Sequence, residues 1–200
     1  MERFLFAIDR INANVGKAFG WCIITLTFGV SYEVFVRYVL NDPTSWAYDI
    51  SYIMYGALFI MAGAYTLSRN GHVRGDVIYR LMPARWQAGI DLTLHILFLF
   101  PGITALVWTG YIYAERSWRF QEVSIFSPAG IPIYPLRTLI PLAGIFLILQ
   151  GVAEVIRCII CLKDGQWPQR LHDVEEMESV ILHEHGHAAH GTAASGEARQ

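Results

Sequence analysis

The sequence predicts an all-α membrane protein with four transmembrane helices, and three observations support this fold class. Only 16% of the 200 residues are charged, whereas 54% are hydrophobic. A soluble domain carries about 25% charged residues, so much of this chain must face something other than water. Four long apolar stretches and an uneven distribution of Lys and Arg complete the pattern. The first predicted partner of the chain is therefore the lipid bilayer.

Each of the four stretches is long enough to cross a bilayer, which takes about 20 residues in a helix. The stretches are too long for buried strands and too uniformly apolar for surface helices. We expect the spans at about residues 18–39, 46–67, 88–113 and 135–162. This places a transmembrane domain over residues 1–165 and an acidic, His-rich cytoplasmic tail over residues 166–200. The end of that tail has the composition of a disordered segment.

A secretory signal peptide is the alternative interpretation of the first stretch, because Arg3 and Arg10 precede it. However, the apolar run is longer than the 7–15 residues of a signal peptide, and no small-x-small cleavage site follows it. We therefore interpret residues 18–39 as a retained span.

Lys and Arg concentrate on one side of the predicted spans, and cytoplasmic segments carry the excess of these residues. Ten lie on the side of the two termini, namely Arg3, Arg10, Lys17, Arg69, Arg74, Arg80, Arg85, Arg157, Lys163 and Arg170. Four lie on the other side, namely Arg37, Arg116, Arg119 and Arg137. We expect both termini in the cytoplasm, and the first and third connections in the periplasm.

The three connections differ in composition. Asp42 and Pro43 end the first span in a tight turn. In the second connection, the apolar residues of the segment 77–86 (VIYRLMPARW) recur at helical spacing, which predicts a short interfacial helix with Arg side chains near lipid phosphates. The third connection, residues 115–135, mixes aromatic, charged and Pro residues. A docking surface and an ordinary solvated loop both fit that composition.

Charged residues inside a span are functional candidates, because an ionised group at the bilayer centre costs roughly 2.5–3.5 kcal/mol. In this chain they lie near the span ends and one helical turn apart, which favours ion pairing or helix contact over transport chemistry. The ion-pair candidates are Glu33 with Arg37, Asp91 with His95, and Glu154 with Arg157. No carboxylate is expected at mid-membrane, so we expect no translocation site in this chain.

The sequence indicates no cofactor and no nucleic-acid partner. A bis-histidine haem needs two axial ligands within the bundle, and only His95 of the seven histidines lies in a predicted span. Cys158 and Cys161 have C-x-x-C spacing, but their apolar helical context favours packing. The formal net charge of −2 gives no indication of nucleic-acid binding.

The tail contains one motif of metalloproteases. His183, Glu184 and His187 match H-E-x-x-H, in which two His ligands bind zinc and the Glu acts as general base. Gly186 weakens a helix at this point, and too few residues follow to build a cleft. We expect no catalysis here. Loose metal binding by histidines and a plain soluble tail remain open, and the candidate ligands are His183, His185, His187 and His190.

The most distinctive residues surround the second span. The segment TSWAYD (44–49) opens the span, GAYTLSRNGHVRGDV (63–77) follows it, and RLMP (80–83) comes next. The order of these motifs on a four-helix plan resembles the small membrane subunit of tripartite ATP-independent periplasmic (TRAP) transporters. The matching positions are Trp46, Asp49, Arg69, Gly71, His72, Arg74 and Asp76. Many members of that family carry a further acid where this chain has Tyr48.

The resemblance implies a transport component of the bacterial inner membrane that is not an enzyme. It implies two protein partners: a large TRAP membrane subunit with the sodium and substrate sites, and a periplasmic substrate-binding protein that captures an organic solute, commonly an organic acid. The small subunit would scaffold the large one. The candidates for subunit contact or anchoring are Trp46, Asp49, Arg69, His72, Arg74 and Asp76. A membrane-anchor subunit of a redox or other enzyme complex is the alternative class.

Overall fold

The computed structural model describes residues 2–69, 79 and 81–168. Apart from one isolated β-bridge, the regular structure in these ranges is helical. Four helical segments are long and apolar enough to cross a membrane, namely Arg3–Leu40, Ala47–Ser68, Ala84–Phe120 and Tyr134–Asp164. The predicted all-α fold class with four candidate spans is confirmed. The description below concerns the compact unit that ends at Trp167.

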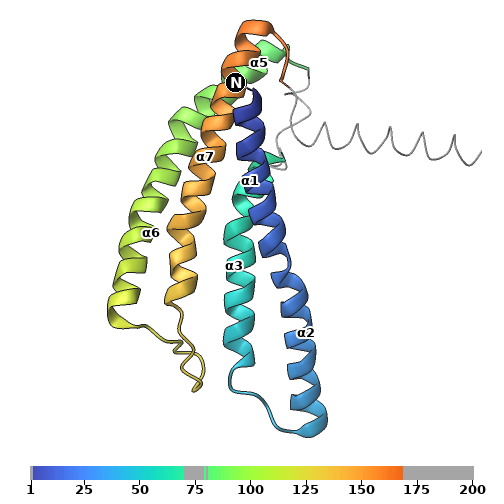
Figure 1. Ribbon diagram of the computed structural model, residues 1–200, viewed down its shortest axis with the longest axis vertical. Coiled ribbons are helices and arrows are strands. Elements are labelled where there is room, and N and C mark those ends of the chain that lie inside the picture. The colour runs from blue at the N-terminus through green and yellow to red at the C-terminus, as the bar shows by residue number, and fades with distance from the viewer. Residues whose placement is uncertain (1, 70–78, 80, 169–200) are drawn as a thin grey trace, which may run out of the picture. The chain divides into compact units, whose positions relative to one another are not determined.

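Two of the four candidate spans are continuous helices, and two consist of several helical pieces (Figure 1). The pieces of the first are α1 (Glu2–Gly20), α2 (Cys22–Phe35) and the π-helical turn η1 (Val36–Leu40). The pieces of the third are α5 (Ala84–Leu94), the π-helical turn η2 (His95–Leu99) and α6 (Phe100–Phe120). The continuous helices are α3 (Ala47–Ser68) and α7 (Tyr134–Asp164).

The helix breaks have local causes. Pro101 is the second residue of α6, two positions after the end of η2. It lacks the N–H that would continue the α-helical ladder, and a wider π-turn accommodates such a gap. Asn41 ends η1 in the left-handed conformation, with φ 58°. Pro43 follows and prevents the helix from continuing. Pro83 is the N-cap of α5, where its missing N–H costs no helical hydrogen bond.

The helices lie beside one another in a row. α6 packs against α7, α7 packs against α3, and α3 packs against both α1 and α2. α7 also contacts α1 and α5, so it is the helix that joins the two halves of the row. Figure 1 shows α6 and α2 at the two outer edges. Large apolar side chains on both edges are exposed, for example Phe28 (72%) on α2 and Trp108 (70%) on α6.

The four candidate spans differ in length. They contain 38, 22, 37 and 31 residues. At 1.5 Å per residue, the 22 residues of α3 cover roughly 33 Å, about the thickness of the hydrocarbon core. The other three are longer, and at one end of the row α1, α5 and α7 extend past the last residue of α3, Ser68 (Figure 1). This end therefore reaches beyond the depth that α3 alone can cross.

The first helix starts well before residue 18, where the sequence predicts the first span to begin. It is helical from Glu2, and the break at Trp21 is a single turn residue. The predicted first span begins only after residue 17, because polar residues such as Asp9 and Asn12 interrupt the apolar run before that point. In the structure both of these side chains are buried, with exposed fractions of 2% and 1%. Their burial against α7 explains why a polar segment continues the helix.

α6 and α7 approach each other closely. A Cβ added at Gly110 would lie 2.9 Å from Cγ2 of Ile140 and 3.3 Å from the backbone nitrogen of Pro141. The absence of a side chain at this position lets the two backbones meet, as small residues commonly do between membrane helices. The contact explains why α6, at the edge of the row, is held along α7.

Two cysteines lie where α5 meets α7. Cys158 and Cys161 are fully buried and pack with Ala88 of α5. The thiol of Cys161 lies 3.7 Å from the backbone carbonyl oxygen of Ala84. Their surroundings are those of core residues.

Two predicted features fall outside the described residues. The interfacial helix expected before Pro83 depends on Val77, Ile78 and Arg80, which the description does not include. The tail with the four candidate metal ligands, His183, His185, His187 and His190, also lies outside it.

Candidate functional site

The connection between α6 and α7 forms a small hairpin. The Ser124 amide donates to the Ile131 carbonyl oxygen at 2.8 Å, and the Ile133 amide donates to that of Glu122 at 3.1 Å. An antiparallel bridge joins Val123 and Pro132 between these two bonds. The 122–133 hairpin therefore has backbone order of its own.

Asp49 of α3 binds this hairpin through hydrogen bonds to its side chains. It lies in the first turn of α3 and is only 1% exposed. Its Oδ1 accepts a hydrogen bond from the Ser124 hydroxyl at 2.5 Å, and its Oδ2 accepts one from the Ser127 hydroxyl. The Ser124 hydroxyl oxygen in turn accepts from the Phe126 amide at 3.2 Å. Because the carboxylate faces its own chain, a role of Asp49 in subunit contact would act through the hairpin.

The tip of the hairpin presents apolar side chains. Ile125 is 88% exposed and Phe126 is 64% exposed. The Phe126 ring packs edge-on against Tyr48, with ring centroids 5.8 Å apart, and lies 6.3 Å from the centroid of Tyr52. Rigidly held apolar side chains that remain exposed are typical of interaction surfaces.

A second carboxylate fixes the neighbouring connection, residues 41–46. Glu33 Oε1 accepts from Arg37 Nε at 3.0 Å and from Nη2 at 2.6 Å. Its Oε2 accepts from the Thr44 amide at 3.2 Å and from the Thr44 hydroxyl. The structure thus forms the Glu33–Arg37 pair and adds Thr44, so the pair holds the turn before α3. Trp46, 40% exposed, stacks on Tyr32 with centroids 6.3 Å apart.

A cavity of about 520 Å³ lies below the hairpin, between α3, α6 and α7. Tyr52, Tyr55 and Leu136 are among its lining residues. Arg137 at its edge pairs with Glu122 and places its guanidinium carbon 4.2 Å from the Tyr113 ring centroid. These contacts tie the hairpin to the first turn of α7 as well as to α3.

A buried polar cluster lies between α1 and α7, at the end of the helices opposite to the hairpin. Arg157 donates from Nη1 to Glu154 Oε1 at 2.7 Å and from Nη2 to Asp9 Oδ2. Gln150 Nε2 donates to Asp9 Oδ1 at 3.0 Å and to Glu154 Oε1 at 3.3 Å, and Asn12 Nδ2 donates to Gln150 Oε1 at 2.6 Å. Each of the five residues is at most 2% exposed. The expected Glu154–Arg157 pair is part of a larger network between helices.

The remaining candidates in the described part have local contacts. His95 Nδ1 lies 2.6 Å from the backbone carbonyl oxygen of Asp91, so this contact joins a side chain to the backbone. The Asp91 carboxylate accepts from the Tyr79 hydroxyl at 2.8 Å. Arg69 places its guanidinium carbon 5.6 Å from the Tyr65 ring centroid. The other anchoring candidates, His72, Arg74 and Asp76, lie outside the described residues.

Among residues 2–69, 79 and 81–168, no group of three or more His, Cys, Asp or Glu side chains is arranged to hold a metal ion. The buried carboxylates of this part bind the chain's own donors instead. Asp9 and Glu154 bind Arg157, Glu33 binds Arg37, and Asp49 binds two serines. The arrangement is suited to holding helices and connections in place.

Sequence reasoning missed five residues of the buried cluster and of the contact between Asp49 and the hairpin. They are Asp9, Asn12, Gln150, Ser124 and Ser127. For Asp9 and Asn12 a signal existed, since both share a helical face with the apolar Leu5 and Ile8 at a spacing of three to four residues. Polar residues on the apolar face of an amphipathic helix suggest a buried polar partner. Nothing in the sequence identifies Ser124 and Ser127, because loop serines are common on solvated surfaces.

Asp49→Ala is expected to loosen the hairpin without unfolding the helices. The change removes a carboxylate that accepts two hydrogen bonds, and each such bond contributes about 1.5–3 kcal/mol. We expect hydrogen exchange at the Ser124 and Ile133 amides to accelerate by roughly two orders of magnitude. Asp42→Ala, which changes an exposed acid at the same end, is the control. Unchanged exchange in Asp49→Ala would show that the backbone contacts alone hold the hairpin.

Comparison with known proteins gives two findings. The family model described as "Tripartite ATP-independent periplasmic transporters, DctQ component" matches residues 26–160. The "Sialic acid TRAP transporter small permease protein SiaQ" of Vibrio cholerae serotype O1 is 21% identical over 126 residues, which cover 63% of this chain and 70% of that relative. The matched region extends from α2 to α7 and includes the hairpin and its Asp49 anchor.

Proposed function

Because the chain belongs to the family of DctQ components of tripartite ATP-independent periplasmic transporters, we propose that it scaffolds the large membrane subunit of such a transporter. As a small permease subunit it is a multi-pass protein of the bacterial inner membrane and a transport component, not an enzyme. The proposed complex also contains a periplasmic substrate-binding protein. Uptake by the complex is proposed to be driven by sodium.

One observation carries the scaffolding role. The buried carboxylates Asp9, Asp49, Glu33 and Glu154 all accept hydrogen bonds from groups of this chain. An ion or substrate pathway needs intramembrane polar groups that are available to the transported species. Groups engaged in this way hold helices in place and leave transport to a partner.

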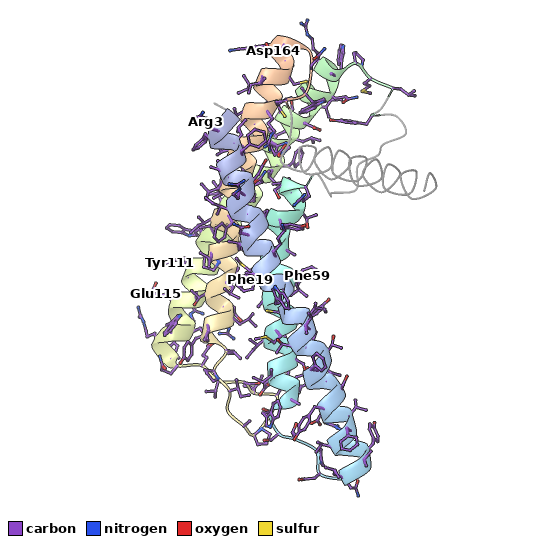
Figure 2. All side chains as sticks on the ribbon, turned by 45° about the vertical axis from the view of Figure 1, so that its right-hand side comes forward. Arg3, Phe19, Phe59, Tyr111, Glu115 and Asp164 are labelled. Atoms are coloured by element: carbon purple, nitrogen blue, oxygen red, sulfur yellow. The ribbon has the colours of Figure 1, made fainter. Side chains whose placement is uncertain are left out.

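The row of helices supports the same role. A closed bundle buries one face of every helix in its centre, whereas a row leaves two broad faces open. Phe59 on α3 is 71% exposed and Tyr111 on α6 is 60% exposed, and both point away from their own helices (Figure 2). We infer that part of these faces packs on the large subunit and part on lipid. The exposed edge of Trp46 is proposed to belong to the subunit contact, as are Arg69, His72, Arg74 and Asp76.

The orientation follows from the distribution of Lys and Arg. We propose that both termini lie in the cytoplasm and that the 122–133 hairpin faces the periplasm, where its apolar tip meets the substrate-binding protein. Residues 1–165 form the proposed membrane domain, and residues 166–200 the proposed cytoplasmic tail. The solute is proposed to be an organic acid, the class to which the sialic acid named for the Vibrio cholerae relative belongs.

Reconstitution in liposomes tests this proposal. The chain alone should show no sodium-driven uptake, whereas the chain together with the large subunit and the binding protein should transport the solute. Omitting this chain from the complete system should reduce uptake at least ten-fold, since the large subunit then lacks its scaffold; this is an order-of-magnitude expectation equal to about 1.4 kcal/mol. Robust uptake by the chain alone would contradict the scaffolding role. Arg116→Ala, a change at an exposed residue, serves as the control that leaves uptake unaltered.

A further inference from the structure

The helix α1 has two different faces. One face is buried against α7 and carries Leu5 and Ile8 together with Asp9 and Asn12. The opposite face is exposed. Its exposed residues include three cations and two large apolar residues, namely Arg3, Arg10, Lys17, Phe4 and Ile11.

The buried polar cluster sets the rotation of this helix. Asp9 binds Arg157 and Gln150, and Asn12 binds Gln150, so two positions one turn apart on α1 are tied to two positions on α7. Turning α1 about its axis would leave the buried Arg157 without one of its carboxylates, which costs several kcal/mol in comparable proteins, about 3–5. The exposed face is therefore held in a fixed direction.

The three cations form one stripe. Arg3, Arg10 and Lys17 are seven residues apart, and seven residues make almost two full turns of an α-helix. None of the three forms an ion pair with any residue of the described part. The one acid between Arg3 and Lys17 in the sequence is Asp9, which is buried on the other face. In Figure 2, Arg3 extends outward from the start of the helix.

Lys17 lies at the level where α3 ends, and the rest of the stripe extends beyond it. A Cβ added at Gly16 would lie 2.5 Å from Cβ of Tyr65, so this point of α1 is level with the last turn of α3. The residues before Gly16 extend past the end of α3, which is the helix whose length matches the hydrocarbon core. Ile11 (51% exposed) lies beside Arg10, about 7.5 Å along the helix axis beyond Gly16. Phe4 and Arg3 lie about 18–20 Å beyond Gly16, too far for the same interfacial layer. Large apolar residues beside Lys and Arg are typical of a helix face that rests at the interface of headgroups and acyl chains.

We propose that this face of α1 binds anionic phospholipid headgroups, with Arg10 and Lys17 contacting phosphates and with Ile11 entering the acyl boundary. The occupant is negatively charged because the stripe presents cations and no acid lies between Arg10 and Lys17. It is lipid because Ile11, beside Arg10, lies near the depth at which α3 ends. The buried cluster with Arg157 positions the face but does not touch the lipid.

Lipid retention by the purified full-length chain tests the proposal. The chain is equilibrated with equal amounts of phosphatidylcholine and phosphatidylglycerol, and bound lipids are counted by native mass spectrometry. The wild-type chain should prefer phosphatidylglycerol. The preference should fall about five-fold for each of Arg10→Gln and Lys17→Gln. Arg3→Gln should change it less, because Arg3 lies further from the end of α3 than the screening length of about 8 Å at physiological salt. The preference should also disappear at about 1 M salt, where the screening length is about 3 Å.

Arg116→Gln with Arg119→Gln is the matched control, because it removes exposed cations from α6 at the other end of the row. It should leave the preference unchanged. An unchanged preference in the variant that carries both Arg10→Gln and Lys17→Gln, or an equal loss in the control, would overturn the proposal. All variants keep the buried face, and an unfolding midpoint equal to that of the wild type shows that the fold is retained.

A photo-crosslinking amino acid at Ile11 distinguishes lipid from an acidic protein surface. In native membranes it should form adducts with phospholipid. Crosslinking to another polypeptide in place of lipid would overturn the proposal. Neither experiment measures transport, so the scaffolding role and the lipid site can fail independently.

Discussion

Arg157→Ala is expected to lower the free energy of unfolding by about 3–5 kcal/mol, the usual cost of breaking a buried ion pair. The guanidinium is fully buried and donates to both Asp9 and Glu154. Its removal leaves two carboxylates close together without their shared cation. The loss is measurable by titration with SDS in mixed micelles, followed by circular dichroism. Asp9→Ala should have an effect of similar size, because it leaves the buried guanidinium with one carboxylate fewer.

An exposed pair on α6 provides the control. Arg119 Nη2 lies 2.7 Å from Glu115 Oε1, and the two side chains are 71% and 49% exposed. Ion pairs of this kind contribute about 0–1 kcal/mol, so Arg119→Ala should change the unfolding free energy only slightly. Equal effects of Arg157→Ala and Arg119→Ala would mean that the cluster between α1 and α7 contributes little to stability.

The second large effect is expected at Gly16, where α1 crosses α3. A Cβ at this position would lie 2.5 Å from Cβ and 2.6 Å from Cγ of Tyr65, distances that side chains do not adopt. Gly16→Ala therefore forces the two helices apart, and overpacking of this kind costs about 1–3 kcal/mol. The same SDS titration measures this loss.

Gly20→Ala is the control for the change in helix propensity. No atom lies within 4 Å of a Cβ built at Gly20. Alanine is favoured over glycine in a helix by up to about 1 kcal/mol, so this variant should be as stable as the wild type or more stable. Opposite signs at the two positions are the expected result. A stabilising Gly16→Ala would show that α1 and α3 cross less closely than the structure indicates.

The polar contacts lie where the connections and the long helices need support. Glu33 and Asp49 fix the two connections at one end of the row, and Arg157 fixes α1 at the other. Groups near a membrane surface lose less hydration than groups at the bilayer centre, so buried charges are tolerated there more easily. The middle of the row is held instead by close packing, as at Gly110 and Pro141.

The fold class and the four spans are predictable from the sequence, because length and hydropathy are properties of single segments. The pairs Glu33–Arg37 and Glu154–Arg157 are predictable for a related reason. Residues three or four apart share one face of a helix whatever surrounds it. The Asp49 motif at the start of the second span is recognisable in the same way, although its hydrogen-bond partners are not.

The partners of Asp9 and Asp49 become visible only in the tertiary structure. Asp9 binds Arg157, which is 148 positions away in the chain, and Asp49 binds Ser124, which is 75 positions away. Such contacts depend on which helices are neighbours, and a helix pattern says which face is apolar but not which helix covers it. For the same reason the polar start of α1 resembles a soluble segment in the sequence, whereas in the structure its Asp9 and Asn12 are buried against α7.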